Sequence, residues 1–218
     1  MFAKIQPHSE YYANARPEIV PFLPEIYTRV LEIGCGEGRF RLNMKRDCEY
    51  FGVEFCAHAA AAAETLLDRV FVGSYDAVAR DIPDSYFDLV ICNDVIEHMP
   101  DHHQFLARIK EKMRPGAFLV GSIPNVRYLP NLFSILFDKE WRYTDSGLLD
   151  RTHQRFFTML SLQRTLLEMG YTVESLKGVN PLGLGERSFR KFVKLAAISL
   201  IGLDSRYLQI GFRARLID

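Results

Sequence analysis

The sequence has 218 residues with 27 basic and 27 acidic side chains, so its formal net charge is zero. Hydrophobic residues make up 48% and charged residues 25% of the chain, which is typical of a soluble globular protein and too apolar for a disordered one. This length is sufficient to bury one full α/β core. The balanced charge argues against a general nucleic-acid-binding protein, because phosphate backbones select basic partners.

The cysteines and the apolar segments indicate a cytoplasmic protein. The four cysteines contain no C-x-x-C pair, as expected of a reduced compartment. The first ten residues lack the apolar core of a secretory signal. The longest apolar stretch, 192–203, is interrupted by Lys194 and is shorter than the roughly 20 helical residues that span a bilayer.

Seven short apolar runs predict β-strands. The first run leads directly into a glycine-rich turn, as a buried strand does. The second ends at Glu54 and the fourth is followed by the pair Asn93 and Asp94. The predicted strands cover 30–33, 50–54, 70–72, 87–92, 117–123, 171–179 and 207–216.

Helices are predicted between these strands. An alanine-rich stretch begins at residue 57 and continues through Leu67, and alanine is the best helix former. Asp101 suits the N-cap of the next helix, which ends before the sequence Arg-Pro-Gly at 114–116. Thr158 begins a further helix that Gly170 ends, and 188–201 is the last candidate.

Strands that alternate with helices predict a parallel sheet with helices on both faces. We expect a single domain over 1–218. Within it, 1–29 forms an N-terminal helical cap, and 185–218 contributes a C-terminal helix and the last strand. The segment 124–157 is rich in proline and aromatic residues and breaks the alternation, which predicts a lid over the substrate.

The turn after the first predicted strand has the sequence E-I-G-C-G-E-G over 32–38. Glycine permits positive φ and a close approach of the backbone to a ligand. A dinucleotide-binding fingerprint would need a third glycine at the position of Arg39, and Glu32 would repel a pyrophosphate. A ligand with an ammonium and a carboxylate on one carbon fits this turn better.

The second predicted strand ends in an acidic residue followed by an aromatic one. Glu54 can accept two hydrogen bonds from a ribose diol, which is the usual reason for an acid at this place in nucleotide-binding sheets. Phe55 can cover one face of a purine.

Four segments together resemble class I S-adenosylmethionine-dependent methyltransferases. They are V-L-E-I-G-C-G-E-G-R-F, Y-F-G-V-E, F-D-L-V-I-C-N-D-V-I-E-H-M-P-D and R-P-G-A-F-L-V-G-S-I-P-N, in the order and spacing of that family. The resemblance implies a Rossmann-like α/β fold with a seven-stranded, mostly parallel, twisted sheet. It also implies S-adenosyl-L-methionine as the methyl donor, with S-adenosyl-L-homocysteine as the product. A later segment, P-N-V-R-Y…W-R-Y-T-D-S-G-L-L-D-R-T-H-Q-R-F-F-T, resembles a bacterial subgroup associated with sugar and cell-surface polysaccharide biosynthesis.

The resemblance also implies roles for individual residues around the cofactor. The methionine end would be held by Glu32 and by the turn that contains Gly34, Cys35 and Gly36, and the ribose hydroxyls by Glu54.

Residues after the third and fourth strands complete the cofactor site that the resemblance implies. Asn93 and Asp94 would line the sulfonium side. The family usually has an acid directly after the glycine that ends the third strand, where this chain has Ser74. We therefore expect Ser74, Tyr75 or Asp76 to contact the adenine.

Methyl transfer requires an aligned nucleophile and the exclusion of water. If the acceptor is a hydroxyl, a general base assists, and histidine is the usual one near neutral pH. His153 in the predicted lid and His98 just past the fourth strand are the two candidates, and transfer without a side-chain base is the alternative. The acidic residues around His98 lack a strong metal-ligand spacing, so no metal site is predicted.

The predicted lid contains four candidate substrate-binding residues, Arg127, Tyr128, Trp141 and Arg151. Aromatic rings stack on sugar or quinone rings, and arginine pairs with phosphate or carboxylate, which favours an anionic acceptor. In the alternative interpretation the aromatics only pack the lid and the arginines are solvated.

The preferred hypothesis is a methyltransferase that O-methylates a sugar, sugar nucleotide or glycan intermediate. Three alternatives stay open. The first is a quinone-precursor O-methyltransferase, since D-V-I-E-H is also typical of that group. The second is a non-catalytic S-adenosylmethionine-binding partner of a glycan-assembly enzyme. The third is an NAD-dependent enzyme, which Arg39 disfavours.

The C-terminal segment is basic, with seven basic and three acidic residues over 185–218. The favoured interpretation is a helix packed on the sheet before the last strand. In the alternative, 187–203 forms a weak membrane-surface contact that reaches a lipid-linked acceptor.

Overall fold

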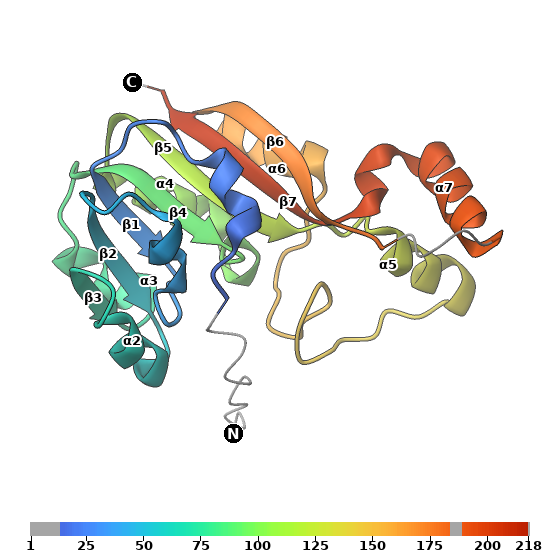
Figure 1. The fold of residues 1–218 in the computed structure, drawn as a ribbon, viewed down its shortest axis with the longest axis horizontal. Helices are drawn as coiled ribbons and strands as arrows, with labels where there is room; N and C mark the ends of the chain where they lie inside the picture. Colours follow the sequence, from blue (N-terminus) through green and yellow to red (C-terminus); the bar gives the residue numbers. More distant parts are fainter. Residues whose placement is uncertain (1–13, 184–188, 218) are drawn as a thin grey trace.

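The computed structural model describes residues 14–183 and 189–217. Its centre is one seven-stranded sheet with the order β3-β2-β1-β4-β5-β7-β6 (Figure 1). Strands β1 to β5 run parallel to one another, and β7 runs antiparallel to both β5 and β6. The strands are β1 Arg29–Ile33, β2 Glu49–Glu54, β3 Arg69–Val72, β4 Phe87–Asn93, β5 Met113–Pro124, β6 Tyr171–Pro181 and β7 Tyr207–Leu216. The predicted mostly parallel, seven-stranded sheet is confirmed.

Both faces of the sheet are buried, as the near-continuous apolar runs require. Side chains alternate between two cores along each central strand, so that Leu31 and Val90 lie in one core and Val30 and Leu89 in the other. The α-helices of the structure are α2 Ala57–Ala63, α3 Tyr75–Val78, α4 His102–Lys112, α5 Leu129–Phe133, α6 Met159–Glu168 and α7 Phe189–Ile201. Shorter turns are the 3-10 helices η1 Pro17–Phe22, η2 Arg39–Asn43, η3 Ala79–Asp81, η4 Ile96–His98 and η6 Leu203–Arg206, and the π-helix η5 Ser134–Asp138.

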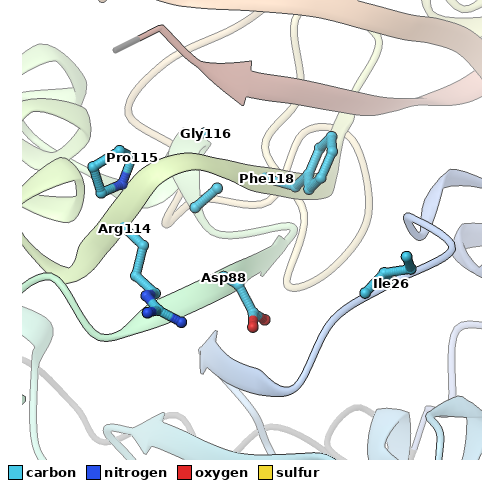
Figure 2. A pocket seen from close by; sticks show the side chains of 7 residues that line it. Ile26, Asp88, Arg114, Pro115, Gly116 and Phe118 are labelled. Carbon is cyan, nitrogen blue, oxygen red and sulfur yellow. The ribbon is translucent and has the colours of Figure 1, made fainter.

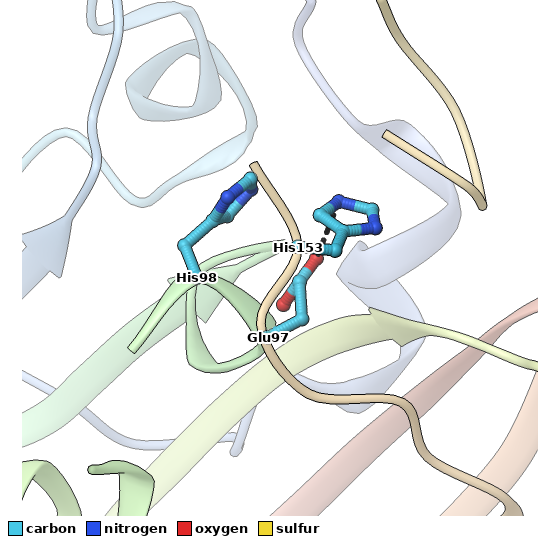
Figure 3. Close-up of side chains that lie close together, drawn as sticks. All are labelled: Glu97, His98 and His153. Atoms are coloured by element: carbon cyan, nitrogen blue, oxygen red, sulfur yellow. Dashed lines mark ion pairs between the residues drawn. The ribbon is translucent and has the colours of Figure 1, made fainter. Parts of the chain in front are cut away.

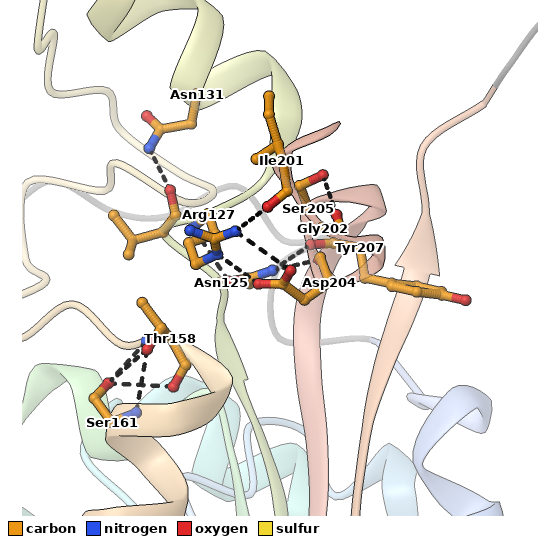
Figure 4. Close-up of polar contacts among 11 residues, drawn as sticks. Asn125, Arg127, Asn131, Thr158, Ser161, Ile201, Gly202, Asp204, Ser205 and Tyr207 are labelled. Carbon is orange, nitrogen blue, oxygen red and sulfur yellow. Dashed lines mark hydrogen bonds and ion pairs between the residues drawn. The ribbon is translucent and has the colours of Figure 1, made fainter. Parts of the chain in front are cut away.

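The predicted helix caps are present. The Asp101 carboxylate accepts a hydrogen bond of 2.9 Å from the Gln104 amide at the start of α4. Thr158 and Ser161 form a reciprocal capping box at the start of α6 (Figure 4). Gly170 follows α6 with φ of 79°.

One helix prediction was wrong in detail. The helix expected through Leu67 ends at Ala63, because the Thr65 hydroxyl donates to the Ala62 carbonyl at 2.7 Å and the chain tightens there. The segment after the glycine turn forms a 3-10 helix. Residues 1–13 of the predicted N-terminal cap lie outside the described residues, and the described part contains η1.

The helix before the last strand does not pack on the sheet, contrary to the favoured prediction. Figure 1 shows α7 beyond the end of the sheet, beside α5. Of the α7 side chains that the structure describes, 192–201, only Ile198 is buried. We call residues 129–143 and 189–203 the terminal lobe. Within the described ranges no helix is long and apolar enough to cross a membrane.

Candidate active site

The carboxyl ends of β1, β2 and β4 meet at one edge of the sheet, because these strands are parallel neighbours. The turn after β1 closes against β2, since the amides of Gly34 and Cys35 both donate to the Val53 carbonyl, at 2.8 and 3.1 Å. Gly34 has φ of 70°, and a Cβ there would lie 2.9 Å from the Val95 side chain. The turn therefore requires glycine at position 34 on two counts.

Two buried carboxyl groups flank this turn. The Tyr50 hydroxyl donates to Glu32 at 2.8 Å, and the Glu54 carboxylate accepts from the amides of Gly36 and Cys56, both at 2.8 Å. Burial raises the pKa of Glu32 to about 8 and raises the pKa of Glu54. Because the buried Glu32 carboxyl group has so high a pKa, it suits a ligand that brings a positive charge to it.

The end of β4 presents an amide and a carboxylate. Within the described residues, both polar atoms of the Asn93 side chain are buried without a hydrogen-bond partner. Unpaired buried polar atoms are costly, so this amide is in the state expected of a ligand-binding group. Asp94 has φ of 53° and accepts from the Ser122 hydroxyl at 2.8 Å, from Arg16 and from Gln209.

The residues that the cofactor is expected to contact thus converge on one edge of the sheet. The glycine turn, the buried carboxyl groups of Glu32 and Glu54 and the unpaired Asn93 amide come from three adjacent parallel strands. Such an edge is where ligands bind in open α/β sheets. This donor set fits S-adenosylmethionine, which carries an ammonium, a ribose diol and a sulfonium.

The segment after β3 contains the three residues predicted as alternative contacts to the adenine, and the structure places them differently. Ser74 is the N-cap of α3, where its side chain accepts from the Ala77 amide at 3.4 Å, and Asp76 forms an ion pair with Arg108. Tyr75 is buried, and its hydroxyl donates to the Arg108 carbonyl at 3.1 Å. The prediction that the Tyr75 side chain contacts adenine is therefore wrong, because this side chain packs in the core. Phe55 is 79% exposed next to Glu54, where a purine can stack on it.

The lid brings His153 to the end of β4. Figure 3 shows His153 facing Glu97, with His98 close by. The His153 Nε2 atom lies 4.0 Å from Glu97 Oε1, and the two imidazole rings meet edge to face at a centroid distance of 4.7 Å. The amides of Gln154 and Arg155 donate to the Glu97 carbonyl at 2.8 and 3.0 Å, which fixes this loop against η4.

The hydrogen bonds of the two histidines define their tautomers. His153 Nδ1 lies 2.9 Å from the Leu148 carbonyl, which can only accept, so Nδ1 carries the proton and Nε2 is the basic atom. The Thr152 hydroxyl donates to Asp150 at 2.7 Å and therefore accepts from His98 Nδ1 at 3.1 Å. Burial and the neighbouring His153 lower the pKa of His98.

Glu97 was not among the predicted site residues. It is almost fully buried, both of its carboxylate oxygens are without a hydrogen-bond partner among the described residues, and burial raises its pKa well above the ordinary value. Its position in D-V-I-E-H beside His98 was visible in the sequence, but the contact with His153 depends on the lid.

Glu97, His98 and His153 can do two kinds of chemistry together. Their ligand atoms all lie within 4.8 Å of one another, so the three side chains could ligate a metal ion, although the sequence spacing predicted none. Nε2 of His153 next to a buried carboxyl group can also act as a general base.

A small cleft extends from Glu97 and His153 to Asp94 at the end of β4. Its lining includes Asp94, Glu97, Asp150, His153 and Gln209. Pro124, Leu148 and Leu208 form an apolar part of the same lining. A larger depression lies at the opposite edge of the sheet, around Ile26, Asp88 and 114–118 (Figure 2). There the Asp88 carboxylate already accepts hydrogen bonds from the amides of Thr28 and Arg29, so this acid is not an unpaired group that awaits a ligand.

The structure does not bring the four predicted substrate residues together. Arg127 pairs with Asp204 at 2.6 Å and donates to the Ile201 carbonyl at 2.7 Å (Figure 4). Arg151 pairs with Asp145 at 2.6 Å on the surface.

The two aromatic candidates pack within the lid region. Trp141 meets Phe156 edge to face at 5.1 Å, and Tyr128 is half-buried where α5 begins. Asp204 and Asp145 thus engage the guanidinium groups of Arg127 and Arg151, so this arrangement gives no support to an anionic acceptor, which stays a prediction.

Arg16 was missed by the sequence analysis. It lies before β1 and has φ of 50°, and its guanidinium reaches across the sheet edge to Asp94, Glu18 and Ser122. A single arginine ahead of the first strand carries no pattern that could have identified this role.

The family model described as a methyltransferase domain matches residues 4–176. The chain belongs to this methyltransferase family. The matched range includes the glycine turn, Glu54 and Asn93, where we expect S-adenosyl-L-methionine to bind.

Two curated relatives of this methyltransferase are ubiquinone biosynthesis O-methyltransferases. The mitochondrial protein of Schizosaccharomyces pombe is 28% identical over 169 residues, which are 71% of this chain and 59% of the relative. The protein of Alkalilimnicola ehrlichii is 29% identical over 164 residues, which are 71% of this chain and 65% of the relative. The chain thus spans less than two thirds of the length of these relatives.

A solved structure shows the same fold. The methyltransferase of Archaeoglobus fulgidus, described as SAM-dependent, is similar with a TM-score of 0.63 at 20% sequence identity, and the match covers 95% of this chain and 94% of that chain.

Proposed function

We propose that this methyltransferase O-methylates a hydroxyl group on a neutral ring acceptor, with His153 as general base. The observation that carries the proposal is the position of His153 Nε2, 4.0 Å from the buried Glu97 carboxyl group in a cleft that reaches Asp94. Oxygen acceptors gain from proton removal, and this is the basic nitrogen that the lid presents there.

The cofactor would be held by the groups at the carboxyl edge of the sheet. Glu32 and the turn of Gly34 to Gly36 would bind the methionine end, Glu54 the ribose hydroxyls, and Asn93 the side of the sulfonium. When bound, S-adenosylmethionine supplies an electrophilic methyl group.

His153 would take the acceptor proton at a nitrogen that lies beside Glu97. The Leu148 carbonyl fixes the imidazole so that Nε2 faces the cleft, where it takes the hydroxyl proton. The Glu97 carboxyl group lies 4.0 Å from this nitrogen, and burial raises its pKa well above the ordinary value. The Glu97 carbonyl holds the amides of Gln154 and Arg155, which keeps the lid over the site and excludes water.

Two features support a neutral phenolic acceptor of the quinone-precursor type. Among the described residues, the lining of the cleft contains no lysine or arginine that would bind a phosphate or a carboxylate. Relatives that match most of this chain are named for ubiquinone biosynthesis. A hydroxyl of a sugar or glycan is the second candidate, supported by the lid sequence around W-R-Y-T-D-S-G-L-L-D-R-T-H.

The test is turnover on two acceptor classes with the full chain. Catechols and hydroxylated benzoquinone precursors form one class, and neutral sugars together with sugar nucleotides form the other. We expect S-adenosylhomocysteine to accumulate with the first class and not with the second. Turnover on sugar nucleotides alone would contradict the proposed acceptor. Binding of the cofactor without turnover on either class would indicate a non-catalytic partner.

A further inference from the structure

The terminal lobe exposes an apolar helical face that nothing in the described structure covers. Phe192, Leu195, Ala196, Ser199 and Leu200 are all exposed, and their spacing places them on one side of α7. Leu200 is 87% and Phe192 is 69% exposed.

The lobe segment 129–143 exposes further apolar side chains. Leu136 and Phe137 of η5 are exposed, and Leu203 continues the surface beyond α7. Figure 1 shows α5 and α7 at the same end of the molecule, away from the sheet. Soluble proteins rarely leave contiguous apolar patches uncovered, so this surface indicates an interaction site.

The lobe is held to the sheet by a fixed polar joint. Arg127 binds the Ile201 carbonyl and the Asp204 carboxylate, and the Asn125 amide donates to the carbonyls of Asp204 and Tyr207 at 2.9 and 3.0 Å (Figure 4). This joint presents α7 outward instead of letting it fold back onto the sheet.

The charges of 189–203 indicate what kind of partner binds the exposed face of α7. The sequence 189–203 contains three basic residues and no acidic one, although the whole chain is neutral. The charged residues of 129–143 are Asp138, Lys139, Glu140 and Arg142, which cancel, so the lobe keeps a formal net charge of +3 from α7. An apolar helix face in a basic segment fits the boundary between acyl chains and anionic headgroups. We propose that the terminal lobe docks on an anionic lipid bilayer surface through α7, with η5 at its side.

This docking would place the lid next to the bilayer. Residues 129–143 belong to the lobe, and the same segment of chain leads on to Asp150 and His153. An amphiphilic acceptor could then reach the cleft from the lipid surface. The proposal does not depend on which hydroxyl is methylated.

The test is flotation of the full chain with vesicles. One set contains phosphatidylcholine and phosphatidylglycerol in equal parts, and the other contains phosphatidylcholine alone. We expect flotation with the anionic vesicles only, and its loss at high salt. The double variant Phe192→Ser/Leu200→Ser should weaken vesicle binding by about tenfold or more, because two exposed apolar side chains no longer insert.

The matched control is Leu160→Ser/Leu167→Ser, which removes two exposed leucines from α6. It should float like the wild type, and both double variants should keep the wild-type melting temperature. A wild-type chain that stays in the soluble fraction would overturn the proposal. So would equal flotation of the two double variants, or a dimer in light scattering that Phe192→Ser/Leu200→Ser dissociates.

Discussion

His153 Nε2 and Glu97 Oε1 lie 4.0 Å apart, although one belongs to the lid and the other follows β4. The contact is inside a cleft whose lining reaches Asp94 at the cofactor edge of the sheet. In the proposed mechanism the segment predicted as a lid would therefore supply a basic nitrogen at the place where an acceptor hydroxyl is deprotonated.

Removal of this nitrogen tests the role of the lid. We expect His153→Ala to lower turnover by about 100-fold or more, which is within the usual contribution of a general base. The affinity for S-adenosylhomocysteine should stay within about twofold of wild type, because His153 is not among the cofactor groups. The control is His58→Ala, an exposed histidine of α2. Turnover of His153→Ala close to that of wild type would remove His153 from the mechanism.

A chelator separates the two chemistries that Glu97, His98 and His153 can support. If His153 acts as a base, dialysis against EDTA leaves turnover unchanged. Added Mg²⁺ or Zn²⁺ should then restore nothing. Loss of turnover with EDTA and recovery with one of these ions would show that the three side chains ligate a metal ion instead.

Gly34→Ala tests the glycine turn. The substitution combines a positive φ, which costs about 1–2 kcal/mol of folding free energy, with a clash against the Val95 side chain. The matched control is Gly147→Ala, which also has positive φ but has no atom within 4 Å of the added Cβ. Thermal unfolding should show a larger loss of stability for Gly34→Ala, and S-adenosylhomocysteine binding should weaken only in that variant. Equal losses in both variants would contradict a close-approach role for the turn.

The raised pKa of Glu32 predicts how cofactor binding depends on pH. In the free protein this pKa is about 8, against an ordinary value of 4.5. The folded state therefore holds a proton in the window between these values that the unfolded chain does not, and Glu32 makes the free protein less stable as the pH rises through it. A ligand ammonium favours the carboxylate, so binding should release this proton.

The measurement is calorimetry of S-adenosylhomocysteine binding in buffers of different ionisation enthalpy. We expect release of up to one proton and affinity that increases by up to about tenfold per pH unit between about pH 6 and pH 7.5. Glu32→Gln should bind more weakly and lose this proton release. Proton release that is unchanged in Glu32→Gln would assign the effect to another group.

The sheet and the cofactor edge could be predicted because their signals are local. Each strand is an apolar run, and Glu54 and Asn93 stand at strand ends where parallel topology brings them together. The helix caps at Asp101 and Thr158 are local in the same way.

The remaining features depend on contacts between distant segments. Arg127 was predicted to bind an anion, but Asp204 occupies it, and no local pattern links these two residues. Tyr75 follows β3 as an adenine contact would, yet its ring packs against Phe105. The position of α7 could not be predicted because its apolar residues suit a buried face as well as an exposed one.

The most direct test of the central claim is calorimetric titration of the full chain with S-adenosylhomocysteine, with NAD as the control ligand. The structure predicts micromolar binding of S-adenosylhomocysteine, no binding of NAD, and a loss of at least tenfold in affinity for Glu54→Ala but not for the exposed Glu64→Ala. Absence of S-adenosylhomocysteine binding, or equal affinity of Glu54→Ala and wild type, would contradict the cofactor site described at the ends of β1, β2 and β4.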